Sequence, residues 1–165
     1  MKICDTVNSK LYKNDRAILH SDCNCFYASV ECLLNPNIRD LPVAVSGDAE
    51  NRHGIILAKN EEAKKYNIKT GEAIWQAKKK CPQLLTVPAR LDVYKKFSDK
   101  VRRIYSDYTD MVEPFGLDEA WLDISEDYKN DALTIAKEIS QRVKDEIGIT
   151  VSIGVSFNKI FAKFG

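Results

Sequence analysis

The feature that most constrains the fold is a long amphipathic run between Leu91 and Tyr108. Its apolar residues recur at three- and four-residue steps, the spacing that gathers one face of an α-helix. A second run of this kind begins at Asp131 and ends before Gly148, a residue type that commonly terminates helices. Two helices that are apolar on one side need an apolar surface to cover, which the rest of the sequence must provide.

Short apolar runs flank these two helices and predict the strands of a sheet. They cover residues 17–21, 111–115, 120–124 and 150–155, and the middle two form a hairpin around Gly116 to Glu119. A further helix is expected to open at Phe157. Helices packed on one face of a mostly antiparallel sheet satisfy this order, so we expect an α+β fold.

Shorter elements fill the stretch between Leu34 and Ala89, and we expect them to form an insertion between the sheet elements. A helix over Phe26–Leu34 leads into this stretch and is stopped by Asn35-Pro36. The apolar runs at 42–46, 54–58 and 84–87 predict strands, and the segments 60–66 and 72–80 predict helices.

The charge of the chain is unevenly distributed. Its 165 residues include 25 Lys and Arg and 24 Asp and Glu, and a net charge of +1 argues against a nucleic-acid partner. Residues 59–103, however, carry 13 basic and five acidic side chains, whereas residues 104–128 carry eight acidic side chains and no Lys or Arg. The basic stretch, which includes Lys78, Lys79 and Lys80, suits phosphate contacts, although for any one of these residues a solvated helix face is the commoner explanation.

Other features of the composition favour the cytoplasm. A membrane-spanning helix needs about 20 apolar residues, and no apolar run in the sequence approaches that length. The polar N-terminal segment also lacks the apolar core of a signal peptide. Five cysteines are an odd number, which favours reduced thiols over a disulfide framework. We therefore expect a cytoplasmic protein with no membrane partner.

Three carboxylates stand apart from the surface charges. Asp22 ends an apolar strand, and Asp118 and Glu119 are adjacent in the predicted hairpin. Carboxylates that converge without a basic partner repel one another, and a divalent cation such as Mg²⁺ or Mn²⁺ relieves the repulsion. Two such ions can align an attacking oxygen and a leaving group. From spacing alone, a helix N-cap at Asp22 and a polar hairpin tip explain the same residues.

Three segments, Asp22–Glu31, Leu117–Asp123 and Ser152–Lys163, together resemble the ordered motifs of the Y-family translesion DNA polymerases, the DinB/UmuC-like group. The resemblance covers nearly all of the chain after Arg16. It implies a palm formed by residues 17–25 and 90–165, inserted fingers at 26–89, and an N-terminal extension at 1–16. The thumb and little finger of the family are absent, so the resemblance also implies a fragment that is inactive or weak as a polymerase when alone.

The resemblance assigns catalytic and metal-binding roles to the acidic residues. Asp22, Asp118 and Glu119 match the family's metal-binding carboxylates, and the backbone carbonyl of Cys23 matches a further ligand. The implied cofactor is a pair of magnesium ions (Mg²⁺), for which Mn²⁺ can substitute.

Nucleotide-binding roles are implied for four further residues. Tyr27 matches the steric gate, whose ring lies where a ribose 2′-hydroxyl would project, and Phe26 matches its aromatic neighbour. By their residue type alone, both would be core aromatics. Many members of the family carry a Tyr and an Arg that contact the triphosphate, where this chain has Glu61 and Lys64. Lys64 can meet a phosphate as a point charge, whereas Glu61 is unsuited to that role.

The implied activity is DNA-directed DNA synthesis in damage tolerance, by attack of a primer 3′-hydroxyl on a deoxynucleoside triphosphate (dNTP). The implied partners are primer-template DNA, dNTP and, through the absent C-terminal region, a sliding clamp. Two alternatives stay open. A palm-fold nucleotide cyclase or other nucleotidyltransferase would use the same carboxylates, and a non-catalytic DNA-damage-response scaffold would not need them. His20 and His53 are expected to have no catalytic role, and Trp75 and Trp121 to lie in the core.

Overall fold

The computed structural model describes residues 16–47, 54–126 and 131–164. The chain divides into two compact units, one formed by Met1–Asn24 and Lys95–Gly165 and the other by Cys25–Tyr94. The predicted extension before Arg16 and the predicted loop residue His53 lie outside the described residues.

The first unit is built on a four-stranded sheet whose strands are all antiparallel, in the order β5-β6-β1-β7. The central strand β1 (Ile18–Cys23) is buried along nearly its whole length and pairs with β6 (Glu119–Asp123) and β7 (Val151–Ser156). The hairpin between β5 (Val112–Phe115) and β6 turns at Gly116, whose φ of 67° favours glycine. This arrangement confirms the predicted antiparallel α+β architecture.

Alternation along β1 sends its side chains to two different environments. Leu19 and Ser21 face one side, where the Ser21 hydroxyl lies 2.7 Å from the Tyr105 hydroxyl of α4 (Leu91–Ser106). His20 and Asp22 face the other side. The strand therefore contributes a core-facing set of residues and a second set available for chemistry.

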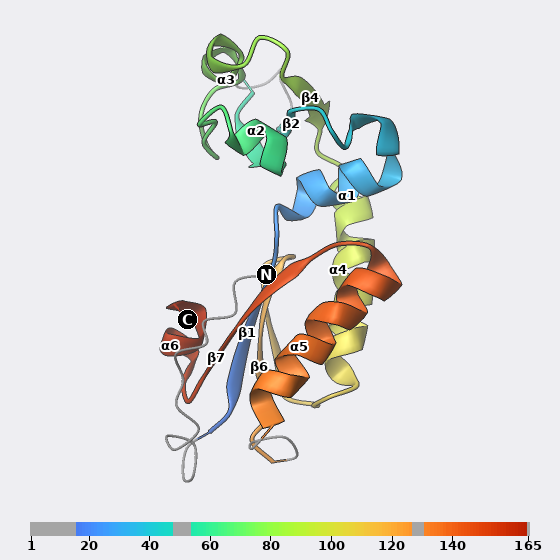
Figure 1. Ribbon diagram of the computed structural model, residues 1–165, viewed down its shortest axis with the longest axis vertical. Helices are drawn as coiled ribbons and strands as arrows, with labels where there is room; N and C mark the ends of the chain where they lie inside the picture. Colours follow the sequence, from blue (N-terminus) through green and yellow to red (C-terminus); the bar gives the residue numbers. More distant parts are fainter. Residues whose placement is uncertain (1–15, 48–53, 127–130, 165) are drawn as a thin grey trace. The chain divides into compact units, whose positions relative to one another are not determined.

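Two helical segments cover the core-facing side of this sheet. The part of α4 from Lys95 onward and α5 (Ala132–Arg142) pack there, and a π-helical turn, η3 (Val143–Ile147), extends α5 to Gly148 (Figure 1). Both amphipathic helices were predicted from their periodicity. The short helix α6 (Lys159–Phe164) lies on the opposite side, against β1 and β7 (Figure 1). The sheet is thus covered on one face and partly covered on the other.

The second unit contains a three-stranded sheet in the order β3-β2-β4. β2 (Val43–Ser46) pairs antiparallel with β3 (Ile56–Lys59) and parallel with β4 (Leu85–Pro88). Among the described residues of this unit, the helical segments beside the sheet include α1 (Phe26–Leu34), the 3₁₀ turn η1 (Pro36–Ile38), α2 (Glu61–Lys64) and α3 (Ile74–Lys80). Its core is a cluster of small and medium apolar side chains, among them Ala44, Ile56 and Leu84.

Asn60 joins α2 to the sheet of the second unit. Its side-chain oxygen accepts hydrogen bonds from the Ala63 and Val43 amides, both at 3.0 Å, so the predicted N-cap also anchors β2. The helix ends earlier than predicted because Asn67 takes a left-handed φ of 55°, and the chain turns there.

Trp75 corrects one prediction about the core. Its side chain is 55 % exposed, with the Lys79 ammonium 4.8 Å from the ring centroid. Apolar character in a short helix does not by itself determine burial, because the ring also gains from a cation placed over its face. No helix among the described residues is long and apolar enough to cross a membrane.

Candidate active site

The three predicted carboxylates lie at one end of the sheet in the first unit. Asp22 and Glu119 are direct partners in the β1–β6 ladder, and Asp118 precedes β6. The Cys23 amide donates a hydrogen bond to the Asp118 carbonyl at 2.9 Å, which fixes the hairpin end against β1. The structure therefore brings together residues 96 and 97 positions apart in the sequence, as the prediction requires.

Burial and mutual repulsion act on two of these acids. The pKa of Asp22 is raised by burial and then by the negative charges of Glu119 and Asp118, although His20 and Lys163 act in the opposite direction. The pKa of Asp118 is also raised, by burial and by the charge of Glu119. Ionisation of both carboxylates is unfavourable in this environment, and a bound cation would stabilise their charged forms.

Glu119 has a different environment from the other two acids. Its Oε2 accepts hydrogen bonds from the Lys163 ammonium at 2.5 Å and from His20 Nε2 at 2.9 Å. Burial acts to raise the pKa of Glu119, but these two hydrogen bonds lower it below its ordinary value. One carboxylate of the cluster therefore has its counter-charge within the protein.

Sequence reasoning missed His20 and Lys163 as members of this cluster. His20 and Asp22 lie two residues apart on β1, so their side chains point to the same face of the sheet. This alternation could have identified His20 from the sequence. Lys163 lies within the third family-like segment, but the sequence could not show that α6 returns to the sheet on the Glu119 side. Both residues belong to the cluster through their contacts with Glu119.

The donor set suits a hard divalent cation. Carboxylate oxygens are the ligands that Mg²⁺ and Mn²⁺ prefer, and Asp22 and Asp118 supply them without a directly bonded basic partner in the described contacts. Across the described residues, no group of three or more His, Cys, Asp or Glu side chains is placed so as to hold a metal ion. Asp22 and Asp118 thus fit the predicted metal site as a pair, and Glu119 would join them only by exchanging its contact with Lys163.

A cavity of about 300 Å³ adjoins the carboxylates. Its lining includes His20, Asp22, Ser152 and Lys163, contributed by β1, β7 and α6. Polar groups of both signs therefore converge on a space large enough for a small ligand group.

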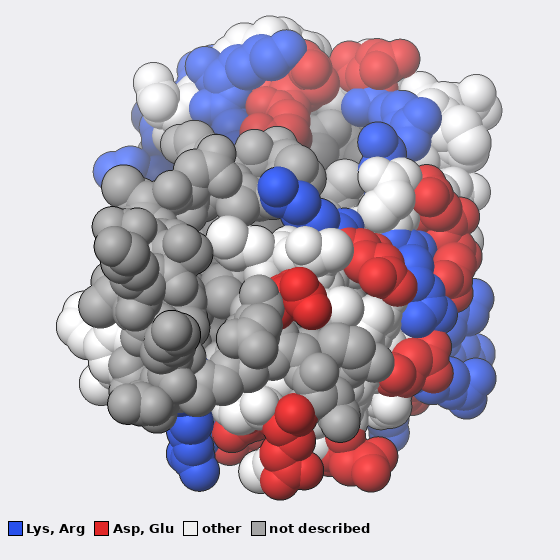
Figure 2. Space-filling model, turned by 60° about the horizontal axis from the view of Figure 1, so that its bottom comes forward, with Lys and Arg blue, Asp and Glu red and all other residues white. Residues whose placement is uncertain are grey.

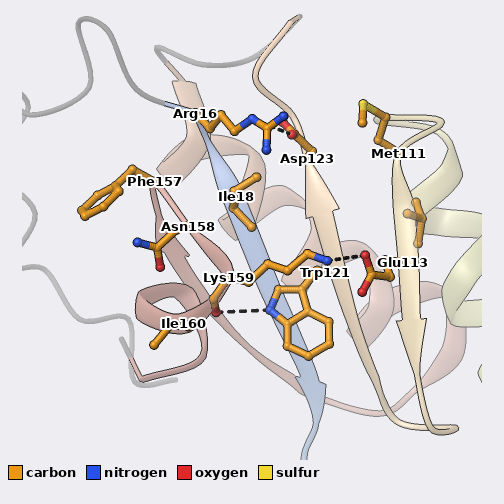
Figure 3. Close-up of a pocket in the computed structure, with 11 residues that line it drawn as sticks. Arg16, Ile18, Met111, Glu113, Trp121, Asp123, Phe157, Asn158, Lys159 and Ile160 are labelled. Atoms are coloured by element: carbon orange, nitrogen blue, oxygen red, sulfur yellow. Dashed lines mark hydrogen bonds and ion pairs between the residues drawn. The ribbon is translucent and has the colours of Figure 1, made fainter.

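A larger cavity of about 720 Å³ opens beside the other end of β1. Trp121, Phe157 and Ile160 give it apolar walls, and Figure 3 shows Lys159 crossing it toward Glu113, with which it forms an ion pair. The Trp121 indole donates a hydrogen bond to the Lys159 carbonyl at 3.3 Å. Trp121, predicted as a core residue, is therefore a half-buried wall of this cavity.

The aromatic residues of the predicted nucleotide site lie on α1 in the second unit. Phe26 is 3 % exposed and belongs to the core, as its residue type suggests. Tyr27 is half-buried, and its ring stacks on Tyr94 with a centroid distance of 4.3 Å and an interplanar angle of 13°. The ring of Tyr27 thus has a fixed neighbour on one side.

Glu61 and Lys64 are bound to each other on α2. The Lys64 ammonium donates to Glu61 Oε1 at 2.7 Å, and the Cys25 thiol donates to the same oxygen at 3.3 Å. The hydrogen bond with Lys64 lowers the pKa of Glu61 and raises that of Lys64, so both groups are charged at neutral pH. The Lys64 ammonium, which was predicted to contact a phosphate, is therefore paired with Glu61.

The thiol of Cys23 is not a candidate ligand. The side chain is 3 % exposed, and burial, followed by the charges of Asp118 and Asp22, raises its pKa to about 12. A buried protonated thiol is a packing group. The predicted role of its backbone carbonyl stays a prediction.

The basic stretch is interleaved with acids. Lys65 pairs with Glu62 and Lys80 with Glu72, each at 2.6 Å, whereas Lys78 and Lys79 are exposed. On the face shown in Figure 2, acidic and basic side chains likewise alternate. A contribution of individual lysines to phosphate binding stays a prediction.

The chain is similar to proteins of one known family. The model of the impB/mucB/samB family matches residues 21–165. Over 152 residues the chain is 60 % identical to a DNA polymerase IV of Acetivibrio thermocellus, which covers 91 % of this chain and 38 % of that protein. It is 44 % identical over 156 residues to a DNA polymerase IV of Moorella thermoacetica, covering 93 % of this chain and 39 % of that one.

Solved structures agree with these sequence relatives. DinB from Sulfolobus solfataricus superposes with a TM-score of 0.84 at 31 % identity, covering 89 % of this chain and 44 % of that one. An insertion ternary complex of Dbh DNA polymerase superposes with a TM-score of 0.85 at 30 % identity and the same coverage. The chain therefore spans about two fifths of the length of the relatives it matches.

Proposed function

The chain belongs to the impB/mucB/samB family of Y-family DNA polymerases, and on this premise we propose that it forms the palm and fingers of a translesion DNA polymerase. The observation that carries the proposal is the pairing of Asp22 with Glu119 beside Asp118 at one end of the sheet. The first unit corresponds to the palm and the second to the fingers.

In this proposal the acidic cluster binds the catalytic metal. Asp22, Asp118 and Glu119 would hold two Mg²⁺ ions, together with the backbone carbonyl of Cys23. When bound there, the ions supply Lewis-acid chemistry for transfer of a nucleotidyl group. Lys163, whose ammonium lies 2.5 Å from Glu119 Oε2, would keep that carboxylate oriented at the site.

The second unit selects the nucleotide in this proposal. The ring of Tyr27 excludes a ribose 2′-hydroxyl, Phe26 supports α1, and Lys64 contacts the triphosphate once it exchanges Glu61 for phosphate. The primer 3′-hydroxyl attacks the α-phosphate, and pyrophosphate leaves. The partners are primer-template DNA and dNTP, consistent with the ternary complex of the Dbh polymerase that this chain resembles. A sliding clamp would bind a region beyond this chain.

Metal binding tests the acidic cluster in this chain itself. Titration with Mn²⁺, monitored by water proton relaxation, should show a tight phase that is lost in Asp118→Ala. The exposed Asp110 of the same unit provides a control, and Asp110→Ala should keep the phase. A tight phase that survives Asp118→Ala would overturn the two-metal proposal.

Polymerase activity is best tested in a longer protein, because the chain matches only 38 % of its relative from Acetivibrio thermocellus. We define the chimera as this chain joined to the remaining part of that DNA polymerase IV. Primer extension by the chimera should depend on Asp22, Asp118 and Glu119.

A non-catalytic scaffold is the second candidate, and the ion pair of Glu61 with Lys64 is the observation that favours it. A scaffold would need neither a free phosphate-binding cation nor a metal. Absence of both a tight Mn²⁺ phase and primer extension by the chimera would favour this candidate.

A further inference from the structure

Glu31 is a buried carboxylate in the second unit that the proposed reaction does not use. It lies on α1, is 6 % exposed, and has both oxygens occupied. Arg90 donates from Nε to Oε1 at 3.0 Å and from Nη2 to Oε2 at 2.5 Å, and the Tyr94 hydroxyl donates to Oε1 at 2.7 Å. A two-pronged guanidinium contact of this kind fixes a carboxylate in orientation as well as position.

Tyr94 connects this carboxylate to Tyr27. The ring of Tyr94 is fully buried, stacks on Tyr27 at 4.3 Å, and meets the edge of Phe26 at 6.4 Å. Burial and the hydrogen bond to Glu31 raise the pKa of Tyr94, so its hydroxyl remains a donor. The ring that supports Tyr27 is therefore anchored at its far end by Glu31.

The spacing of these residues makes the arrangement rigid. Glu31 lies four positions after Tyr27 on α1, so both project from the same face of that helix. Arg90 lies four positions before Tyr94, whose amide donates to the Arg90 carbonyl at 3.1 Å. The turn of α1 that carries Tyr27 and Glu31 is thus linked to the turn that carries Arg90 and Tyr94, both by the ring stack and by the ion pair.

The Glu31 carboxylate is buried, whereas the Arg90 side chain is 45 % exposed, so the ion pair is only partly removed from water. Burying the carboxylate still costs free energy that an apolar side chain of similar volume would not cost. What an ion pair adds is a single defined geometry. Tyr94 transmits this geometry to the ring of Tyr27 through the ring stack. We therefore expect changes at Glu31 to alter the selectivity that the Tyr27 ring provides.

We propose that Glu31, clamped by Arg90, positions Tyr94 and through it the ring of Tyr27, and thereby determines the discrimination between deoxyribose and ribose. Glu31 is a positioning residue, because it acts through Tyr94 and touches no substrate. The proposal rests on the proposed role of Tyr27 as the steric gate.

The first test measures the Tyr27 ring directly in this chain. Labelling with 3-fluorotyrosine gives one ¹⁹F resonance for each of the seven tyrosines, and Tyr27→Phe identifies the one from Tyr27. Glu31→Gln and Tyr94→Phe should shift or broaden that resonance. Tyr94→Phe retains the stacked ring and removes only the hydroxyl, so it is informative even if Glu31→Gln fails to fold. The control is Glu62→Gln, which removes an equal charge from the ion pair with Lys65 in the same unit.

The second test measures sugar selectivity as the ratio of kcat/KM for dNTP and ribonucleotide in primer extension by the chimera. Glu31→Gln and Tyr94→Phe should lower this ratio about fivefold, the factor equivalent to one hydrogen bond of about 1 kcal/mol. The change should come from faster ribonucleotide use, whereas simple destabilisation would slow both substrates alike. Glu62→Gln should leave the ratio unchanged.

The outcomes separate this inference from the function on which it rests. If Tyr27→Ala leaves sugar selectivity unchanged, the steric-gate proposal fails. If Tyr27→Ala relaxes selectivity but Glu31→Gln and Tyr94→Phe alter neither the ratio nor the Tyr27 resonance, the positioning role of Glu31 is overturned and the gate stands.

Discussion

Asp22 and Glu119 face each other directly across the β1–β6 ladder, so their side chains leave the same face of the sheet. Like charges in opposed positions destabilise a sheet unless a counter-charge is near. Lys163 supplies that counter-charge to Glu119 through a hydrogen bond of 2.5 Å, and His20 adds a second hydrogen bond at 2.9 Å. The stability of the first unit should therefore respond in opposite directions to removal of the Asp22 charge and to removal of the Lys163 charge.

Asp22→Asn should stabilise the chain at neutral pH. The pKa of Asp22 is raised in the folded state, so ionisation costs stability as pH rises through that folded pKa. The group is only partly buried, and with solvent screening we expect a gain of about 0.5 kcal/mol. The gain should vanish at pH values below the ordinary Asp range, where the native carboxyl is protonated in both states.

Thermal unfolding followed by circular dichroism at neutral and acidic pH, without divalent cations, measures this effect. A melting temperature for Asp22→Asn below that of the parent at neutral pH would contradict the repulsion described for the cluster.

Lys163→Met should have the opposite effect. The pKa of Glu119 is lowered in the folded state, so the stability it contributes is present above its unfolded pKa and lost as pH falls through the folded one. Because Lys163 is 39 % exposed, the loss at neutral pH should be only about 0.5 kcal/mol. Denaturant unfolding should show parent and variant converging in acid. The control is Lys144→Met, at an exposed position of η3. An equal loss of stability in this variant would mean that the effect comes from the change in net charge and not from the contact with Glu119.

Local signals in the sequence were sufficient for most elements. The helix α1 has the predicted bounds because Asn35-Pro36 cannot continue it, and the end of the η3 turn follows from Gly148. β6, in contrast, begins one residue earlier than predicted, at Glu119. Pairing with Asp22 determines that start, and pairing is a long-range property that local alternation does not contain.

The acidic cluster was predicted only in part for a related reason. The sequence predicts a helix that opens at Phe157, and α6 begins at Lys159. No local pattern shows which face of the sheet this helix covers, so the contact between Lys163 and Glu119 was missed. The link from Glu31 to Tyr94 joins residues 63 positions apart and leaves no local pattern. Such contacts depend on the packed structure.

Tyr27→Ala in the chimera should increase ribonucleotide incorporation about tenfold or more, since the ring is a steric barrier to the 2′-hydroxyl in the proposed site. The ratio of kcat/KM for dNTP and ribonucleotide in primer extension measures the change. Tyr66→Ala removes an exposed tyrosine of the same unit and should leave the ratio unaltered. Equal effects of the two substitutions would reject the assignment of Tyr27.

Glu61→Gln in the chimera should lower the KM for dNTP, because it releases the Lys64 ammonium from the 2.7 Å contact that now engages it. Both side chains are largely exposed, so the pair is weak and the expected change is about threefold. Lys64→Ala should raise KM, and the double variant should resemble Lys64→Ala, because Glu61 acts only through Lys64. Steady-state primer extension provides all three values. A KM that rises in Glu61→Gln would instead mean that the carboxylate itself assists the nucleotide, and Lys64 would lose its proposed role as the phosphate contact.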